Sequence, residues 1–224
     1  MSVIGDLGAC RPLRRDAERN RQRVIDAARE VFAQRGLAAT LDDVAHHAGV
    51  GVGTVYRRFP TKEALVEVAL ASRLAEFTEL ADEAMRAPTG WAGLTMLLCR
   101  SAEMHAADRG LRDVALNAGL SPRGPGKEDT RIIPVVQHLL DRAHAEGELR
   151  PDATIEDLLM VMLMVSEVAH HSRGIRPDAY GRYLQLLIDG LRPSPDAGDL
   201  GRPLTRTEAD TLAARWLPNC DPRH

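Results

Sequence analysis

Residues 40–65 read TLDDVAHHAGVGVGTVYRRFPTKEAL, and their spacing predicts two short helices joined by a tight turn. Thr40 stands three residues before Asp43, which is the order of a capping box at the start of a helix. Gly49 ends this first helix, and Pro60 ends the second because proline disfavours helical geometry in the preceding residue. The stretch therefore predicts a helix-turn-helix, an arrangement whose second helix can enter the DNA major groove.

The sequence on either side supplies the rest of a compact helical unit. Upstream, one helix is predicted from about residue 16 to residue 36, because apolar residues recur there at helical spacing: Val24, Ala28, Val31 and Phe32. Downstream, Thr61 is placed to cap a long helix from Lys62 toward Met85. We therefore expect the two short helices to pack between two longer ones.

Several residues of the second short helix are left outside the apolar set that packs it. They offer methyl groups that suit thymine, and hydroxyl and guanidinium groups that suit phosphates or base edges: Val52, Gly53, Thr54, Tyr56, Arg57 and Arg58. Gly53 has no side chain that would hold DNA away. These residues are the candidate DNA contacts that the pattern itself indicates.

The same segment resembles the DNA-binding domain of TetR-family repressors. The resemblance lies in the run AxxAGVxxGTVYxxFxxKExL at residues 45–65, preceded by AAxxVFxxxG at residues 27–36. It implies phosphate contacts by Thr40, Tyr56 and Lys62, and groove contacts by Val52, Gly53, Thr54 and Arg58. The fold it implies is all-α, with an N-terminal three-helix helix-turn-helix domain joined by a long fourth helix to a helical ligand-binding and dimerisation domain.

The chain departs from the family pattern at Gly51, where family members usually carry a serine. A glycine can occupy the first position of the recognition helix, but it loses the side-chain contact to phosphate. Arg57 and Arg58 add two positive charges nearby. We therefore hypothesise that these arginines carry an unusual share of the DNA affinity.

The rest of the chain predicts four segments with different roles. Residues 1–15 form a flexible basic arm, residues 16–62 the DNA-binding domain, and residues 63–192 an effector-binding and dimerisation domain of helices. Residues 193–224 form a Pro/Gly-rich extension with a short helix from about residue 206, where Thr205 and Glu208 have capping-box spacing. Residues 121–127 read SPRGPGK and are predicted to be a loop.

The resemblance implies a homodimer whose last two major helices, at about residues 154–172 and 177–191, form a four-helix bundle with their counterparts. The sequence agrees independently, because the first of these helices is apolar on more than one face. The residues predicted to form this interface are large and mostly aliphatic: Leu158, Leu159, Leu163, Tyr183, Leu184, Leu187 and Leu191.

The resemblance also implies a pocket for a small-molecule effector among the middle helices. The inward candidates are Phe77, Leu98, Ala102, His105, His138, Met162 and Ser166. His105 can be a core histidine or a ligand contact, and Met162 can be plain core packing or an adaptable ligand wall. Both alternatives remain open at the level of sequence.

Composition limits the other function classes. Residues 1–62 hold 11 Lys and Arg against 7 Asp and Glu, a net charge of +4, and the remainder holds 18 against 25, a net charge of −7. The basic end suits a nucleic-acid partner. The three cysteines are widely separated, and the longest apolar run is far shorter than the roughly 20 residues that a membrane helix needs. We expect a cytoplasmic protein with no metal, no cofactor and no membrane partner.

These observations predict a sequence-specific transcriptional regulator, a repressor that a small molecule releases from a palindromic operator of double-stranded DNA. One alternative is an architectural DNA-binding protein without an effector, although about 160 residues of non-basic helical domain argue against it. A helical enzyme is the other. Its one candidate motif, GPGK at residues 124–127, has Ser121 where a phosphate-binding loop requires its first glycine. We therefore predict no enzymatic activity.

Overall fold

The computed structural model describes residues 10–120 and 132–216. Within these ranges every regular element is a helix, which agrees with the predicted all-α fold. The helices are α1 (Cys10–Arg35), the 3-10 turn η1 (Gly36–Ala38), α2 (Leu41–Ala48), α3 (Val52–Arg58), α4 (Lys62–Met85), α5 (Gly90–Ala107), α6 (Arg109–Leu120), α7 (Ile132–Ala145), α8 (Ile155–Ser172), α9 (Ala179–Gly190) and α10 (Arg206–Trp216).

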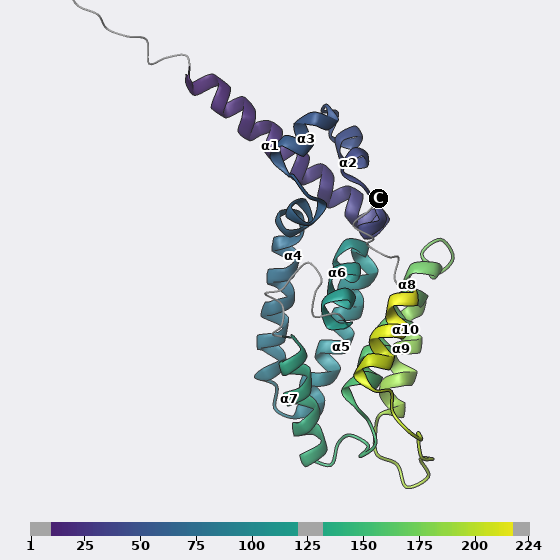
Figure 1. The fold of residues 1–224 in the computed structure, drawn as a ribbon. Helices are drawn as coiled ribbons and strands as arrows, with labels where there is room; N and C mark the ends of the chain where they lie inside the picture. Colours follow the sequence, from purple (N-terminus) through teal and green to yellow (C-terminus); the bar gives the residue numbers. More distant parts are fainter. Residues whose placement is uncertain (1–9, 121–131, 217–224) are drawn as a thin grey trace, which may run out of the picture.

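The helices divide between the two ends of an elongated molecule. In Figure 1, α1, α2 and α3 lie at one end, the long helix α4 leads away from them, and α5 to α10 fill the other end. Each end has its own group of buried apolar residues. The first group includes Phe32, Val44 and Val55 and extends along α4 as far as Leu70, and the second lies mainly between α5, α7, α8 and α9.

The local signals around the helix-turn-helix act as predicted. The Thr40 hydroxyl accepts a hydrogen bond from the Asp43 backbone N–H at 3.1 Å, and an Asp43 carboxylate oxygen accepts from the Thr40 backbone N–H at 2.9 Å. Gly49 ends α2 with a φ of 63°, a left-handed conformation that favours glycine. The Thr61 hydroxyl accepts from the Ala64 N–H at 3.2 Å and so begins α4.

The first helix is longer than the sequence indicates. It begins at Cys10 rather than near residue 16, so residues 10–15 belong to α1 and not to a basic arm. Pro12 is compatible with this start because it stands in the first turn, where a backbone N–H has no helical acceptor. The predicted arm at residues 1–9 and the predicted loop at residues 121–127, with its GPGK motif, lie outside the described residues.

The C-terminal extension folds back onto the second end of the molecule (Figure 1). Arg150 anchors it, because this side chain pairs with Asp152 at 2.6 Å and donates to the Gly198 carbonyl at 2.6 Å. The predicted capping box of α10 is present, with the Thr205 N–H donating to Glu208 at 2.8 Å. The buried residues Ala209 and Ala213 turn α10 inward, and α10 packs on α6 and α8.

No helix in the described ranges combines the length and the apolar character that crossing a membrane requires.

Candidate nucleic-acid interface

The inner side of α3 holds this short helix firmly against its neighbours. Val55 is fully buried, and Phe59, which follows the helix, is nearly so. The Gly51 carbonyl accepts the first helical hydrogen bond from the Thr54 N–H at 2.8 Å, and no side chain caps this end. Gly51 therefore starts the helix through its backbone alone, as the departure from the usual serine predicts.

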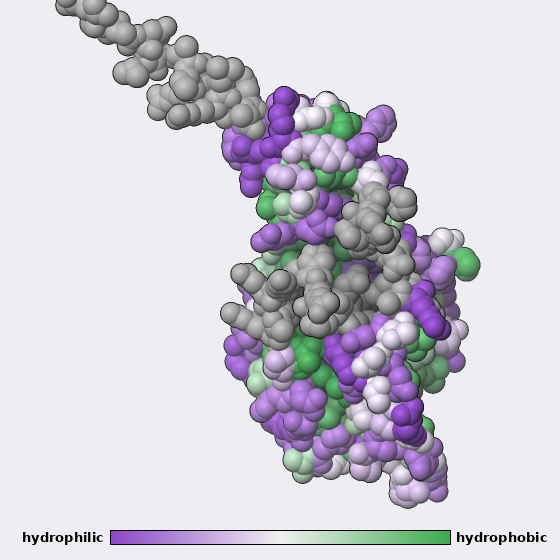
Figure 2. Space-filling view, viewed as in Figure 1, coloured by the Kyte–Doolittle hydropathy of each residue, from purple (hydrophilic) through white to green (hydrophobic). Residues whose placement is uncertain are grey.

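The outer side of α3 presents the predicted contact residues together. Val52 is 42% exposed and Tyr56 is 48% exposed. Gly51, Gly53, Arg57 and Arg58 are exposed as well, and Thr54 is half-buried. Figure 2 shows the end of the molecule formed by α1, α2 and α3 as a mixture of hydrophilic side chains and paler or apolar ones. This mixture suits a surface that meets both phosphates and base edges.

Gly53 leaves the backbone of α3 open to the outside. Apart from its chain neighbours and the backbone of its own helix, no described residue has an atom within 4 Å of the position a Cβ would take here. The fold therefore does not need a glycine here for packing, and the open space is on the side that a bound nucleic acid would occupy. A glycine in a helix is otherwise unfavourable relative to alanine.

Two predicted contact residues are already used in bonds within the domain. The Thr40 hydroxyl donates to an Asp43 carboxylate oxygen at 2.8 Å. Hydrogen bonds from the backbone and the hydroxyl of Thr40 hold the pKa of Asp43 below its usual value. The Lys62 ammonium donates to the Leu37 carbonyl. Each group retains further hydrogen-bonding capacity, since a hydroxyl has a second lone pair and an ammonium has three N–H groups.

The two arginines at the end of α3 differ in their surroundings. A guanidinium nitrogen of Arg58 lies 3.6 Å from a Glu18 carboxylate oxygen of α1, and both side chains are exposed. Among the described residues no ion pair involves Arg57. Arg57 is therefore free to contact a phosphate directly. Arg58 must first break its ion pair with Glu18, or contact Glu18 and a phosphate at the same time.

Two arginines of α1 support the interface from its inner side, and sequence reasoning did not predict them. Arg23 of α1 donates to the Ala48 carbonyl at the end of α2, at 2.8 Å. Arg29 of α1 donates to the Ala69 carbonyl of α4, at 3.1 Å. These bonds join α1 to the helices on both sides of α3, so they fix the orientation of the exposed face. The sequence alone does not indicate whether an arginine on a helix surface donates to a backbone carbonyl of another helix.

Comparison with known proteins adds independent information about both ends of the molecule. A family model described as bacterial regulatory proteins, tetR family, matches residues 24–69. A second model, described as transcriptional regulator SbtR-like, C-terminal domain, matches residues 91–193. Together the two models cover more than half of the chain. The chain belongs to the TetR family. It is therefore a DNA-binding transcriptional regulator with an all-α fold.

Individual relatives agree with this assignment to the TetR family. The regulator SrpR of Pseudomonas putida is 51% identical over 59 residues, which are 26% of this chain and only 28% of SrpR. The repressor KstR2 of Mycobacterium tuberculosis is 28% identical over 144 residues, which are 61% of this chain and 72% of KstR2. The solved structure of an ArpA-like gamma-butyrolactone receptor is 25% identical, covers 90% of this chain and 98% of its own, and has a TM-score of 0.52.

Beyond the DNA-binding domain of this TetR-family chain, three of the predicted effector residues come together. The rings of Phe77 and His105 are stacked with their centroids 6.1 Å apart, and the Ser166 hydroxyl lies 3.4 Å from Nδ1 of His105. His105 is buried, and among the described residues its Nε2 has no hydrogen-bond partner. Burial, followed by the positive charge of Arg112, lowers the pKa of His105 to about 4. This imidazole is therefore neutral near pH 7.

The other predicted effector residues divide between the interior and the surface. Leu98, Ala102 and Met162 are buried in the second apolar core. The prediction for His138 is wrong, because this side chain is exposed. The buried residues of α7 are Leu139, Leu140 and Ala143, which turn His138 away from the interior.

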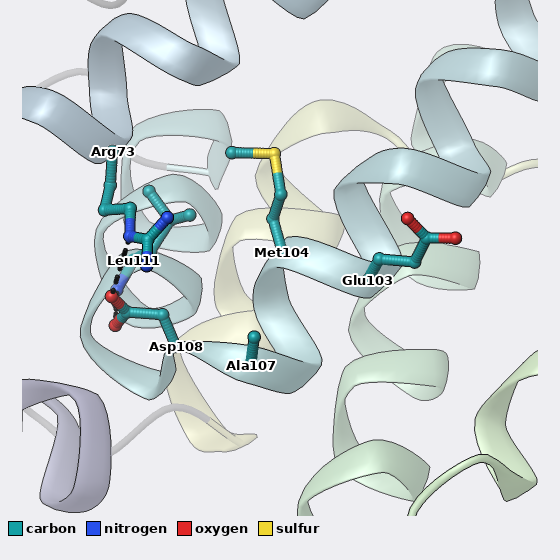
Figure 3. A pocket seen from close by; sticks show the side chains of 6 residues that line it. All are labelled: Arg73, Glu103, Met104, Ala107, Asp108 and Leu111. Carbon is teal, nitrogen blue, oxygen red and sulfur yellow. Dashed lines mark hydrogen bonds and ion pairs between the residues drawn. The ribbon is translucent and has the colours of Figure 1, made fainter.

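A cavity of about 170 Å³ lies nearby and is lined by residues of α4, α5 and α6 together with Asp108, which joins α5 to α6: Arg73, Glu103, Met104, Ala107, Asp108 and Leu111. None of these residues was predicted. Figure 3 shows Arg73 reaching toward Asp108, and the two side chains form an ion pair at 3.9 Å. The sequence could not indicate this cavity because half of its lining residues are charged, whereas the predicted effector residues lie on apolar helix faces.

The predicted dimer residues are also divided. The predictions for Leu158, Leu163, Leu184 and Leu191 are wrong as surface contacts, because these side chains are buried in the core of their own chain. Tyr183 is exposed, and Leu159 and Leu187 are half-buried. The sequence missed Met164 and Leu186, which are 39% and 56% exposed on the same two helices. The most regular apolar stripe faces the chain's own core, and the exposed apolar side chains lie on the less regular side.

Among the described residues, no three His, Cys, Asp or Glu side chains come close enough together to hold a metal ion.

Proposed function

We propose that this TetR-family chain is a homodimeric repressor that binds a palindromic operator through α3 and releases it when a small molecule binds the helical body. The observation that carries the proposal is the outer side of α3. It combines an open glycine backbone with exposed Val52, Tyr56, Arg57 and Arg58 on a helix that Val55 holds from inside. The proposed contacts also include Thr40, Gly51, Thr54 and Lys62.

The proposed organisation keeps the predicted effector-binding and dimerisation domain at residues 63–192, and it extends the predicted DNA-binding domain, residues 16–62, back to the start of α1 at Cys10. A homodimer is proposed because one recognition helix buries little DNA, so proteins of this kind bind two half-sites. The exposed apolar side chains of α8 and α9 support this assembly. Binding to chromosomal DNA would place the protein in the cytoplasm.

Repression and effector release are proposed from the relatives together with the interior of the body. KstR2 is a transcriptional repressor, and the ArpA-like protein is a gamma-butyrolactone receptor. In this chain, the group formed by Phe77, His105 and Ser166 and the cavity between α4, α5 and α6 are the two candidate places for an effector. The effector is expected to change the separation of the two recognition helices in the dimer.

Selection of DNA fragments by the purified full-length protein tests the proposal directly. We expect recovery of a palindrome whose half-sites lie about one helical turn apart, roughly 34–36 Å. Arg57→Ala should then weaken binding to this operator and lower its dependence on salt by about one unit of slope, because one phosphate contact is lost. Recovery of fragments without a shared sequence would instead favour an architectural DNA-binding protein.

A further inference from the structure

The link between α1 and α2 lies directly against α6 of the helical body. Gly36 in this link has a φ of 66°, and a Cβ there would collide with the side chains of Asp113 and Arg109. Gly110 of α6 lies so close to α1 that a Cβ there would be 3.1 Å from the Phe32 carbonyl oxygen. The two domains therefore meet at backbone distance, through two glycines, at this point.

A buried carboxylate fastens this contact. The Leu37 backbone N–H donates to an Asp113 carboxylate oxygen at 2.8 Å, and Asp113 is only 1% exposed. The carbonyl of the same Leu37 accepts from the Lys62 ammonium. The backbone of Leu37 is therefore bonded to two helices, to α6 through its N–H and to the start of α4 through its carbonyl.

The connection continues from Asp113 across α6 to α8. Arg112, which is 2% exposed, donates from Nε and Nη2 to the other Asp113 carboxylate oxygen at 3.0 and 2.8 Å. Its Nη1 donates to Glu167 of α8 at 3.3 Å. A continuous polar chain therefore runs from the backbone of the DNA-binding domain to a helix that carries exposed apolar residues of the proposed dimer face.

Stability alone is a weak reason for such a chain of charges. Replacing buried ion pairs with apolar residues of similar volume is often neutral or stabilising, whereas removing one partner is strongly destabilising. What charged hydrogen bonds supply is direction, because two N–H groups of the Arg112 guanidinium converge on one Asp113 carboxylate oxygen while the other oxygen accepts from Leu37. An apolar contact at the same place would allow α6 to slide against the link.

We infer that Arg112 and Asp113 are positioning residues for operator recognition, which fix the DNA-binding domain relative to α8 and so set the separation of the two recognition helices in the dimer. The inference rests on the proposed operator-binding dimer and names the side chains that hold its geometry. Loosening the network lets each DNA-binding domain move, so that both rarely fit two half-sites together. Contact of one domain with a single half-site does not depend on this separation.

The test compares binding to two DNA duplexes, the selected palindrome and a duplex that carries one half-site, by fluorescence anisotropy at low salt. Asp113→Asn leaves a single carbonyl oxygen where two carboxylate oxygens served Leu37 and Arg112. We expect its affinity for the palindrome to fall about tenfold, within the usual range of coupling between sites, while its affinity for the half-site stays unchanged. Glu167→Gln should have the same pattern with a smaller loss, of about threefold.

Asp152→Asn is the matched control, because Arg150 and Asp152 also form a close ion pair, at 2.6 Å against 2.8 Å for Arg112 and Asp113, and theirs lies within the body and does not touch the DNA-binding domain. We expect it to leave binding to both duplexes unchanged. If Asp113→Asn does not fold, Glu167→Gln decides alone, since the Glu167 side chain is partly exposed and its loss is tolerated more easily.

Equal losses on the two duplexes would overturn the inference, because they would mean that the DNA-binding domain itself is damaged. Unchanged palindrome affinity in folded variants would overturn it too. A wild-type protein that selects no DNA sequence would refute the proposed function and the inference with it. By contrast, the inference alone fails if the wild-type protein binds its palindrome and the folded variants bind it equally well.

Discussion

Gly53 stands in α3 with a backbone conformation outside the left-handed region and with open space where a Cβ would lie. Neither packing nor backbone geometry requires a glycine here, so we expect its benefit to lie in DNA binding. Gly53→Ala should raise the free energy of unfolding by up to about 1 kcal/mol, because glycine is unfavourable in a helix. The same variant should weaken operator binding by placing a methyl group against the DNA. Thermal unfolding and anisotropy measure the two effects.

Gly181→Ala provides the control for Gly53→Ala. Gly181 is likewise an exposed glycine in the first turn of a helix, with no atom within 4 Å of the Cβ position, but it lies in α9 at the other end of the molecule. It should stabilise the protein similarly and leave DNA binding unchanged. If Gly53→Ala binds the operator as tightly as wild type, the outer face of α3 does not approach the groove closely.

Glu18 of α1 is the acidic residue that pairs with Arg58 of α3. It lies 3.6 Å from Arg58, and both groups are exposed, so the ion pair itself contributes little to stability. Glu18→Gln should tighten operator binding severalfold, since it frees the Arg58 guanidinium and removes a negative charge near the phosphates. Glu79→Gln changes an exposed carboxylate on α4 far from α3 and should have no effect. Equal tightening in both variants would mean that only total charge matters.

At the scale of single helices, α8 and α9 carry the proposed dimer face. Leu186 is 56% exposed on α9, where a monomer gains nothing from a large apolar side chain. Leu186→Glu should convert the dimer to a monomer with little loss of monomer stability, as measured by light scattering and thermal unfolding. Leu200→Glu is the control, because Leu200 is equally exposed but lies in the C-terminal extension. A dimer that survives Leu186→Glu places the interface elsewhere.

The helices also show why the sequence predicted one site well and the other poorly. The helix-turn-helix depends on contacts between near neighbours in the chain, such as Thr40 with Asp43, so its residue types report directly on its structure. The dimer face and the effector region depend on which side of an apolar helix meets which neighbour. Leu163 and Met164 are adjacent and equally apolar, yet the first is buried and the second exposed. Only the packing of the whole body decides between them.

For the whole molecule, the most consequential buried group is His105. Its pKa is lowered from 6.5 to about 4, first by burial and then by the charge of Arg112. The unfolded chain therefore binds a proton at a pH where the folded chain does not. The contribution of this group to stability is complete above pH 6.5 and is lost as the pH falls toward 4. The loss amounts to about 3 kcal/mol, at 1.36 kcal/mol for each pH unit.

Denaturant unfolding between pH 7 and pH 4 measures this loss, and His105→Gln should remove most of it while keeping a polar side chain beside Ser166. Asp152 and Glu208 are carboxylates whose pKa values are lowered to about 2. They affect stability mainly below pH 4.5, so they add little to the change between pH 7 and pH 4.5. Burial also lowers the pKa of His170, so this residue adds to the loss of stability at low pH. His138→Gln, at an exposed position, is the control for the replacement of a histidine by glutamine as such. If His105→Gln keeps the full pH dependence of stability, the fold does not lower the pKa of His105. A neutral His105 imidazole would then not be available throughout this pH range as a hydrogen-bonding group for an effector.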